Sequence, residues 1–157
     1  KTKVRAGDAQ QDIIVTREFD LPVELLFTAH TDPEIFEQWM THEYGKTKVV
    51  KMECKKYGGF HFQTIDAHGT VLFSANGVIH EFVPNESIVR TFEMENTPFK
   101  AQLEFLEFEK LSEDTSKLNM HIIYRTPELR DQHLKMPFEY GMNLAHNRLQ
   151  EILQTLK

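Results

Sequence analysis

The chain has 157 residues, 40% hydrophobic and 27% charged, a composition typical of a folded globular domain rather than a disordered one. No apolar run approaches the roughly 20 residues that a membrane-spanning helix needs, so no membrane span is predicted. The formal net charge of −6, together with the lack of a basic stripe, argues against nucleic acid as a partner. One cysteine, Cys54, cannot form an intramolecular disulfide and fits a reducing, cytoplasmic location.

The N-terminal third of the sequence predicts one strand and two short helices. Residues 1–11 are polar and are interpreted as a lead, with a single domain over residues 12–157. Residues 12–20 are β-branched and aromatic, which is typical of a strand, and residues 22–30 have apolar side chains at helical spacing. Asp32-Pro33-Glu34 then has the chemistry of a helix start, because the aspartate can cap and the proline needs no N–H donor at the first position.

The remaining sequence predicts a run of strands followed by one long helix. From about Pro127 the apolar period returns to 3.6, with one stripe formed by Leu134, Phe138, Met142, Ala145, Leu149, Ile152 or Leu153, and Leu156. Before it, six strands separated by turn-forming sequence are expected at residues 46–54, 60–66, 71–83, 87–94, 101–110 and 117–125. Consecutive hairpins indicate an antiparallel meander, so the predicted fold class is α+β. In it, a curved sheet of seven strands grips the long C-terminal helix.

The order of these motifs resembles that of the START/Bet-v-type helix-grip (SRPBCC) superfamily. Asp32-Pro33-Glu34 leads to Trp39, Gly58-Gly59-Phe60 follows, Gly77 precedes "EFVPNESIV", and a long helix ends the chain. More narrowly, the sequence is similar to bacterial members related to the C-terminal domain of the activator of the heat-shock-protein-ninety ATPase. The resemblance covers residues 12–157. It implies a cavity between sheet and helix that binds apolar or aromatic small molecules, and only some branches use that cavity as an active site.

Trp39 is the single tryptophan and the second short helix ends beside it. In the fold that the resemblance implies, this helix lies at one end of the grip, so Trp39 is expected to form a lid or wall of the cavity. The alternative is that its indole fills an irregular part of the core, with no ligand involved.

Strand alternation predicts which side chains face the cavity. The segment 78–82 is expected to direct Val78, His80 and Phe82 inward, because the opposite choice would bury Glu81 without a partner. The same alternation places Arg90 and Phe92, and then Met120 and Tyr124, on the inward face. The expected ligand-binding residues are Trp39, Phe62, Val78, His80, Arg90, Phe92, Met120, Tyr124, Phe138 and Met142.

His80, Arg90 and Tyr124 are the polar members of this predicted wall. An inward Arg90 could hold a ligand carboxylate and His80 could donate to a carbonyl, which would favour an anionic or carbonyl-bearing apolar ligand. Alternatively, Arg90 pairs with an internal carboxylate or reaches the rim, and His80 is a satisfied core histidine. Glu104 and Glu107 are interpreted as solvated or edge charges.

Three functions remain open. The first is non-catalytic binding of a small hydrophobic molecule, the second a cyclase- or hydrolase-like reaction in the same cavity, and the third a chaperone-interaction domain. No base and nucleophile pair is visible, so no catalytic residue is predicted. The histidines lack metal-ligand spacing, so no metal site and no cofactor are predicted. The oligomeric state is left open.

Overall fold

The computed structural model describes residues 1–7 and 10–157. In these residues the chain forms one antiparallel sheet of eight strands, in the order β1-β2-β8-β7-β6-β5-β4-β3, and four helices. The strands are β1 (Lys3–Ala6), β2 (Asp12–Phe19), β3 (Lys46–Met52), β4 (Gly59–Ile65), β5 (Val71–Val83), β6 (Ser87–Met94), β7 (Ala101–Lys110) and β8 (Ser116–Ile123). The helices are α1 (Val23–Thr31), α2 (Pro33–Met40), α3 (Pro127–Lys135) and α4 (Phe138–Gln154).

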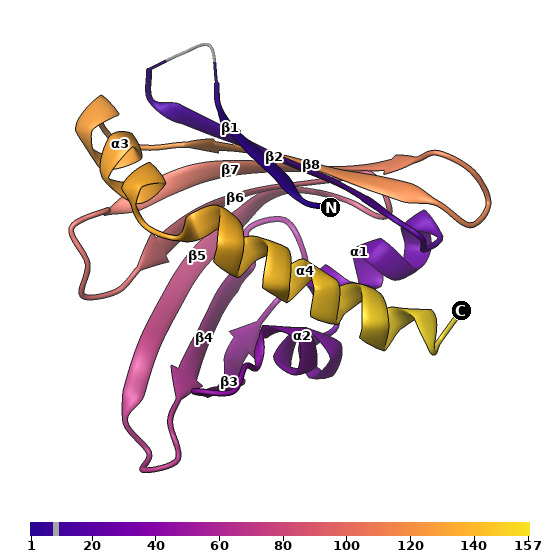
Figure 1. The fold of residues 1–157 in the computed structure, drawn as a ribbon, viewed down its shortest axis with the longest axis horizontal. Coiled ribbons are helices and arrows are strands. Elements are labelled where there is room, and N and C mark those ends of the chain that lie inside the picture. The colour runs from indigo at the N-terminus through magenta and orange to yellow at the C-terminus, as the bar shows by residue number, and fades with distance from the viewer. Residues whose placement is uncertain (8–9) are drawn as a thin grey trace.

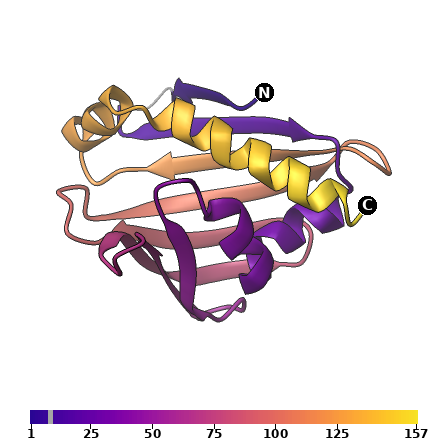
Figure 2. The ribbon, with the colours of Figure 1, turned by 60° about the horizontal axis from the view of Figure 1, so that its bottom comes forward.

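The predicted α+β helix grip is confirmed. Helix α4 runs obliquely across the concave face of the sheet, and α1 and α2 lie beneath its C-terminal half (Figures 1 and 2). Each of the six predicted strands after residue 45 matches a strand of the sheet to within a few residues at either end.

The sheet has one more strand than the sequence predicts. Residues 3–6, assigned above to a polar lead, form β1 and pair antiparallel with β2. Only Val4 of this strand is an apolar β-branched residue, so local alternation carries no strand signal here. Its pairing with the edge of β2 depends on tertiary structure.

The single long C-terminal helix that periodicity predicts is two helices, and Pro137 separates them. Proline lacks an N–H and its ring disfavours helical geometry in the preceding residue, so Met136 is extended, with φ −78° and ψ 160°. The break turns α3 away from α4 (Figure 1). As a result Leu134, predicted to lie in the apolar stripe, is exposed.

The capping prediction for α2 is confirmed. One carboxylate oxygen of Asp32, Oδ1, accepts hydrogen bonds from the backbone N–H groups of Glu34 (2.9 Å) and Ile35 (3.1 Å), and Pro33 occupies the first helical position. The cap anchors the start of a helix that is only eight residues long. Trp39 is thereby held at the C-terminal end of α2, one residue before its last.

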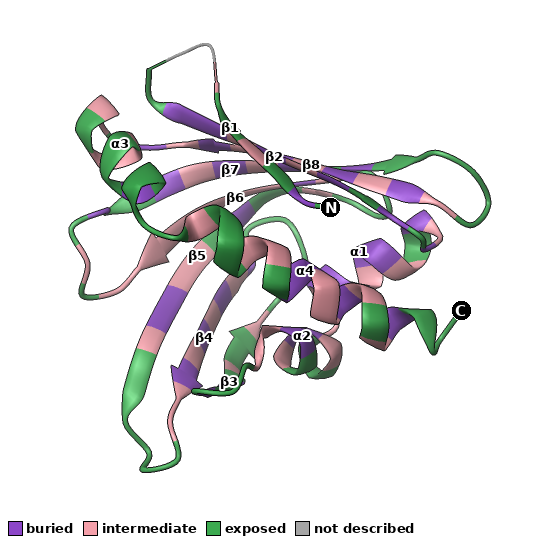
Figure 3. Ribbon diagram, viewed as in Figure 1, coloured by how far each residue is buried: buried purple, intermediate pink, exposed green. Residues whose placement is uncertain are grey.

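The core lies between the concave face of the sheet and the helices. Figure 3 shows buried positions along the strands of the sheet and along α4, where they alternate with exposed positions. The largest side chains that are almost fully buried include Phe19, Leu26, Leu106, Leu118 and Leu149. These residues come from α1, α4 and the strands β2, β7 and β8.

Candidate ligand-binding cavity

A cavity of about 290 Å³ lies between the sheet, α2 and α4. Its wall is mainly aromatic and thioether, with a smaller set of polar side chains. It is lined by His30, Phe36, Trp39, Met40, Phe62, Phe73, Arg90, Phe92, Met94, Gln102, Glu104, Met120, Ile122, His133, Phe138, Gly141, Met142, Ala145 and His146. This volume is at the small end of the roughly 300–1,000 Å³ typical of ligand pockets, so the space suits a molecule of one or two rings or a short acyl chain.

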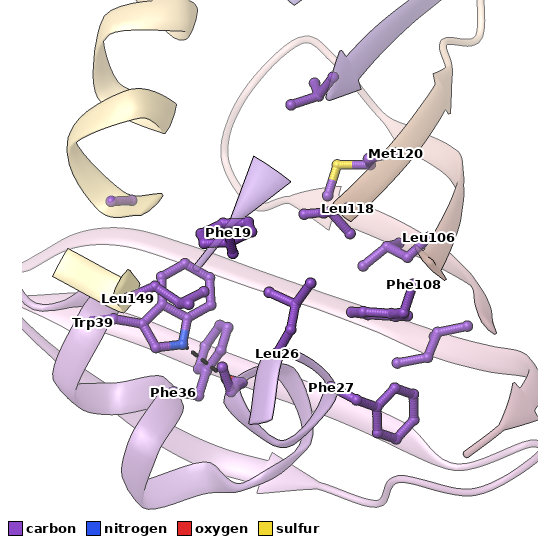
Figure 4. Packing of buried hydrophobic residues seen from close by; sticks show 14 of the residues in the cluster. Phe19, Leu26, Phe27, Phe36, Trp39, Leu106, Phe108, Leu118, Met120 and Leu149 are labelled. Carbon is purple, nitrogen blue, oxygen red and sulfur yellow. Dashed lines mark hydrogen bonds between the residues drawn. The ribbon is translucent and has the colours of Figure 1, made fainter. Parts of the chain in front are cut away.

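Trp39 is a fixed wall of this cavity. Its side chain is buried, and the indole Nε1 donates a hydrogen bond to the backbone oxygen of Ala29 at 2.8 Å. Its ring packs edge-on against those of Phe36 and His30, with centroids 5.3 Å apart in each pair. Figure 4 shows the indole beside Phe36 and below Leu149, with its nitrogen aimed at the neighbouring helix. These contacts join α1 to α2 and define one end of the cavity.

The predicted inward orientation of Val78 and His80 is wrong, because β5 contains a bulge. The register with β6 shifts between Ile79 and Glu81, so an extra residue interrupts the alternation. Ile79 pairs with Arg90, whose side chain lines the cavity, and directly opposed residues share a face of the sheet. Val78 and His80 therefore project from the other face and are exposed.

Phe82 regains the inward orientation after the bulge and packs on the ring of Phe27, with centroids 5.4 Å apart. The glycine just before the bulge is required by close packing. A Cβ on Gly77 would lie 2.0 Å from the backbone oxygen of Thr91 and 2.5 Å from the ring of Phe60. Gly77 thus allows β5 and β6 to approach while Phe60 covers the inner face.

Arg90 faces the cavity side and pairs with an internal carboxylate. Its Nε donates to Oε1 of Glu104 at 2.9 Å, and the side chains of both residues are largely buried. The guanidinium carbon also lies 5.2 Å from the ring centroid of Phe60 and 5.6 Å from that of Phe92, within the range of cation–π contacts. Of the two alternatives left open by the sequence, the structure has the internal ion pair.

Glu104 was interpreted from the sequence as a solvated or edge charge, and that interpretation is wrong. Only 4% of the residue is exposed, because it shares the inward alternation of β7 with Gln102, Leu106 and Phe108. Its second oxygen, Oε2, accepts from Nε2 of Gln102 at 2.8 Å. Leu106 and Phe108 are apolar residues two positions apart on β7. Glu104 lies two positions before Leu106, so the same alternation predicts that it points inward.

Tyr124 is inward and buried but does not line the cavity. Its hydroxyl is hydrogen bonded to Nδ1 of His133, which comes from α3 and does line the cavity. Burial raises the pKa of the Tyr124 phenol and lowers the pKa of His133 to about 4, so both groups are neutral near neutral pH. The pair ties the end of β8 to α3 at the cavity wall.

Two further histidines, missed by the sequence analysis, line the opposite end. Desolvation lowers the pKa of His30 to about 4 and that of His146 to about 3. His30 hydrogen bonds through Nδ1 to the backbone oxygen of Leu26 at 2.9 Å, and Nδ1 of His146 bonds to the hydroxyl of Thr2 at 2.8 Å. Both imidazoles are therefore uncharged polar wall groups.

The structure brings most of the predicted ligand-binding residues together. Seven line one cavity, namely Trp39, Phe62, Arg90, Phe92, Met120, Phe138 and Met142. Val78, His80 and Tyr124 do not. Gln102, Glu104, His30, His133 and His146 complete the polar part of the wall, and they come from segments too far apart in the sequence to form a recognisable motif.

Within the described part of the chain, no helix is long and apolar enough to cross a membrane. Among the same residues, no group of three or more His, Cys, Asp or Glu side chains is arranged to hold a metal ion.

Comparisons with solved structures agree with this architecture. A protein of Rhodobacter sphaeroides is 19% identical, with a TM-score of 0.90 over 99% of both chains. Protein Ms6760 of Mycobacterium smegmatis is 18% identical, with a TM-score of 0.84 over 96% of this chain and 95% of its own. Protein NE0264 of Nitrosomonas europaea is 20% identical, with a TM-score of 0.80 over 98% of this chain and 100% of its own. At such identities the likeness shows the fold alone.

No curated protein matches the sequence. A family model does match, over residues 20–154, and its description is "Activator of Hsp90 ATPase homolog 1-like protein". The matched range runs from the end of β2 to the end of α4, so it includes both short helices, the curved part of the sheet and the cavity. The chain belongs to the family of activator of Hsp90 ATPase homolog 1-like proteins, within the helix-grip superfamily.

Proposed function

We propose that this protein binds a small hydrophobic or aromatic molecule in the cavity between the sheet and α4, without catalysing a reaction. The observation that carries the proposal is the composition of the wall: Phe36, Trp39, Phe62, Phe92 and Met120 surround a space of about 290 Å³. On binding, an apolar ligand would remove both its own apolar surface and the surface of these side chains from water. At about 25 cal/mol per Å², each 100 Å² covered contributes on the order of 2.5 kcal/mol, before the costs of ordering are subtracted. Micromolar affinity is therefore expected.

The absence of catalysis is part of the proposal because the titratable wall groups are already committed. Nε of Arg90 pairs with the carboxylate of Glu104, and the hydroxyl of Tyr124 bonds to His133. A general base needs to be within hydrogen-bond reach of the proton that it removes and to have a pKa near the working pH. The lowered pKa values of His30, His133 and His146 make these imidazoles weak bases.

Trp39 provides the direct test. A panel of small aromatic and acyl compounds should include some that change Trp39 emission saturably, with one molecule bound per chain in calorimetry. Trp39→Ala should abolish the optical signal and weaken binding measured by calorimetry. Full affinity in that variant would show that the indole does not contact the ligand.

A second variant tests the location of the site. Gly141 lines the cavity on the same helical face as Phe138 and Ala145, and a Cβ added there would meet nothing within 4 Å. Gly141→Phe should place a ring at this wall and reduce affinity at least tenfold while the fold is kept. Glu151→Phe, at an exposed position of the same helix, is the matched control and should bind normally. Equal affinities in the two variants would contradict binding in this cavity.

A further inference from the structure

The charges in the cavity wall are internally balanced. Of the residues lining it, Arg90 and Glu104 are the charged pair, and their side chains are in direct contact at 2.9 Å. Both oxygens of the Glu104 carboxylate have a donor, one from Arg90 and the other from Gln102. The rings of Phe60 and Phe92 lie close to the guanidinium. The wall therefore has no net charge to offer an ionised ligand.

This balance disfavours a carboxylate ligand. An anion entering the cavity would lose its hydration and would also face the carboxylate of Glu104. An opposite charge offsets such a desolvation cost only when it is free to pair with the anion. Arg90 is already paired with Glu104. The buried histidines supply no compensating positive charge, because burial lowers their pKa values far below neutrality.

Gln102 completes the hydrogen bonding of the Glu104 carboxylate. Its Nε2 must be the atom that faces Glu104, because an ionised carboxylate can only accept hydrogen bonds. The amide orientation is thus determined, and Oε1 is left as an acceptor. This oxygen has no hydrogen-bond partner among the described residues, and it has almost no accessible surface. It therefore lies behind the wall, and a ligand in the cavity cannot reach it.

His30, in contrast, offers an acceptor to a ligand in the cavity. Its Nδ1 faces the backbone oxygen of Leu26, which can only accept, so the single proton of the neutral ring is on Nδ1. Nε2 is then an acceptor on a side chain that lines the cavity. The wall thus presents an acceptor at His30 beside aromatic surface.

We infer that the cavity selects uncharged aromatic molecules that carry a hydrogen-bond donor such as a hydroxyl group, that Nε2 of His30 accepts from this donor, and that Glu104 excludes anions by neutralising Arg90. This inference rests on the proposed binding function and specifies its ligand class. Glu104 is in this view a specificity-determining residue that acts through Arg90.

Three ligands with one ring system test the inference by calorimetry near neutral pH: 2-naphthol, 2-methoxynaphthalene and 2-naphthoate. The expected order is naphthol first, the methyl ether weaker because it lacks the donor, and naphthoate at least tenfold weaker than naphthol. Naphthoate binding as tightly as naphthol would overturn the inference while leaving the proposed function intact. Failure of all three to bind would instead count against the proposed function itself. This comparison uses the wild-type protein, so it does not depend on the folding of any variant.

Variants assign the effect to residues. Glu104→Gln frees the charge of Arg90 and should raise the affinity for naphthoate relative to naphthol at least tenfold. Glu107→Gln removes the same charge at an exposed position of the same strand and should leave the ratio unchanged. His30→Phe removes the acceptor and should abolish the advantage of naphthol over its methyl ether. An unchanged naphthoate-to-naphthol ratio in folded Glu104→Gln, or a retained naphthol advantage in folded His30→Phe, would contradict the role assigned to that residue.

Discussion

The buried imidazole of His30 connects the stability of the fold to pH. Only 7% of the residue is exposed, and the pKa falls from an ordinary 6.5 to about 4, mainly because burial disfavours the charged ring. The hydrogen bond to Leu26 raises the pKa in part, and the nearby charge of Arg90 lowers it. Between pH 6.5 and about 4 the unfolded chain binds a proton that the folded chain does not.

Protonation of His30 in the unfolded chain therefore lowers the free energy of unfolding as the pH falls from 6.5 toward 4. Above pH 6.5 this loss of stability does not occur. One pKa unit corresponds to about 1.4 kcal/mol, so the loss from this residue is roughly 3 kcal/mol. Urea unfolding near pH 7 and near pH 4.5 should show the decrease, and His30→Gln should reduce it. His68→Gln, at an exposed turn position, serves as the control. The same pH dependence in His30→Gln as in wild type would show that other groups dominate.

Helix α4 is held to the sheet by the buried part of its apolar stripe. Leu149 and Leu153 are fully buried, whereas Glu151 between them is exposed. Leu149→Ala should lower the free energy of unfolding by about 2–5 kcal/mol, because the substitution leaves a cavity in a packed core. Glu151→Ala should change it by less than about 0.5 kcal/mol. Denaturant melts that give two small and equal effects would contradict the packing described for this end of α4.

The neighbouring Gln150 would be a poor control for this experiment. It is half-buried, and its amide bonds to the backbone N–H and oxygen of Asp20 at 2.9 and 3.3 Å. Helical periodicity places Gln150 outside the apolar stripe and so predicts an exposed side chain. The end of β2 passes close enough to this side chain for both hydrogen bonds to form.

At the scale of the whole molecule, ligand binding should stabilise the fold. A ligand that binds only the folded state stabilises it by RT ln(1 + [L]/Kd), which is about 2.7 kcal/mol at a hundredfold excess over Kd. The compound that binds best in calorimetry should raise the melting temperature of the wild-type protein in proportion. The Gly141→Phe variant should show a smaller rise at the same ligand concentration. Equal rises would place the binding site elsewhere in the molecule.

The sequence by itself determined most of the architecture. Its alternation of apolar residues predicted the strands, and Asp32-Pro33-Glu34 predicted the start of α2, because these signals are local and depend on a few neighbouring residues. Seven of the ten predicted ligand-binding residues line one cavity. Four of them lie on β4, β6 and β8, whose inward faces keep their alternation, and the other three lie on α2 and α4.

Only the tertiary structure decided the rest, where distant segments or irregular backbone control the outcome. The β5 bulge moved Val78 and His80 to the outer face. The division of the final helix at Pro137 is, in contrast, a local signal, which the apolar period running across it obscures. Glu104 is tolerated inside because Arg90 reaches it from the neighbouring strand. The electrostatic character of the cavity depends on this contact, and spacing along one chain cannot report which charge lies opposite another.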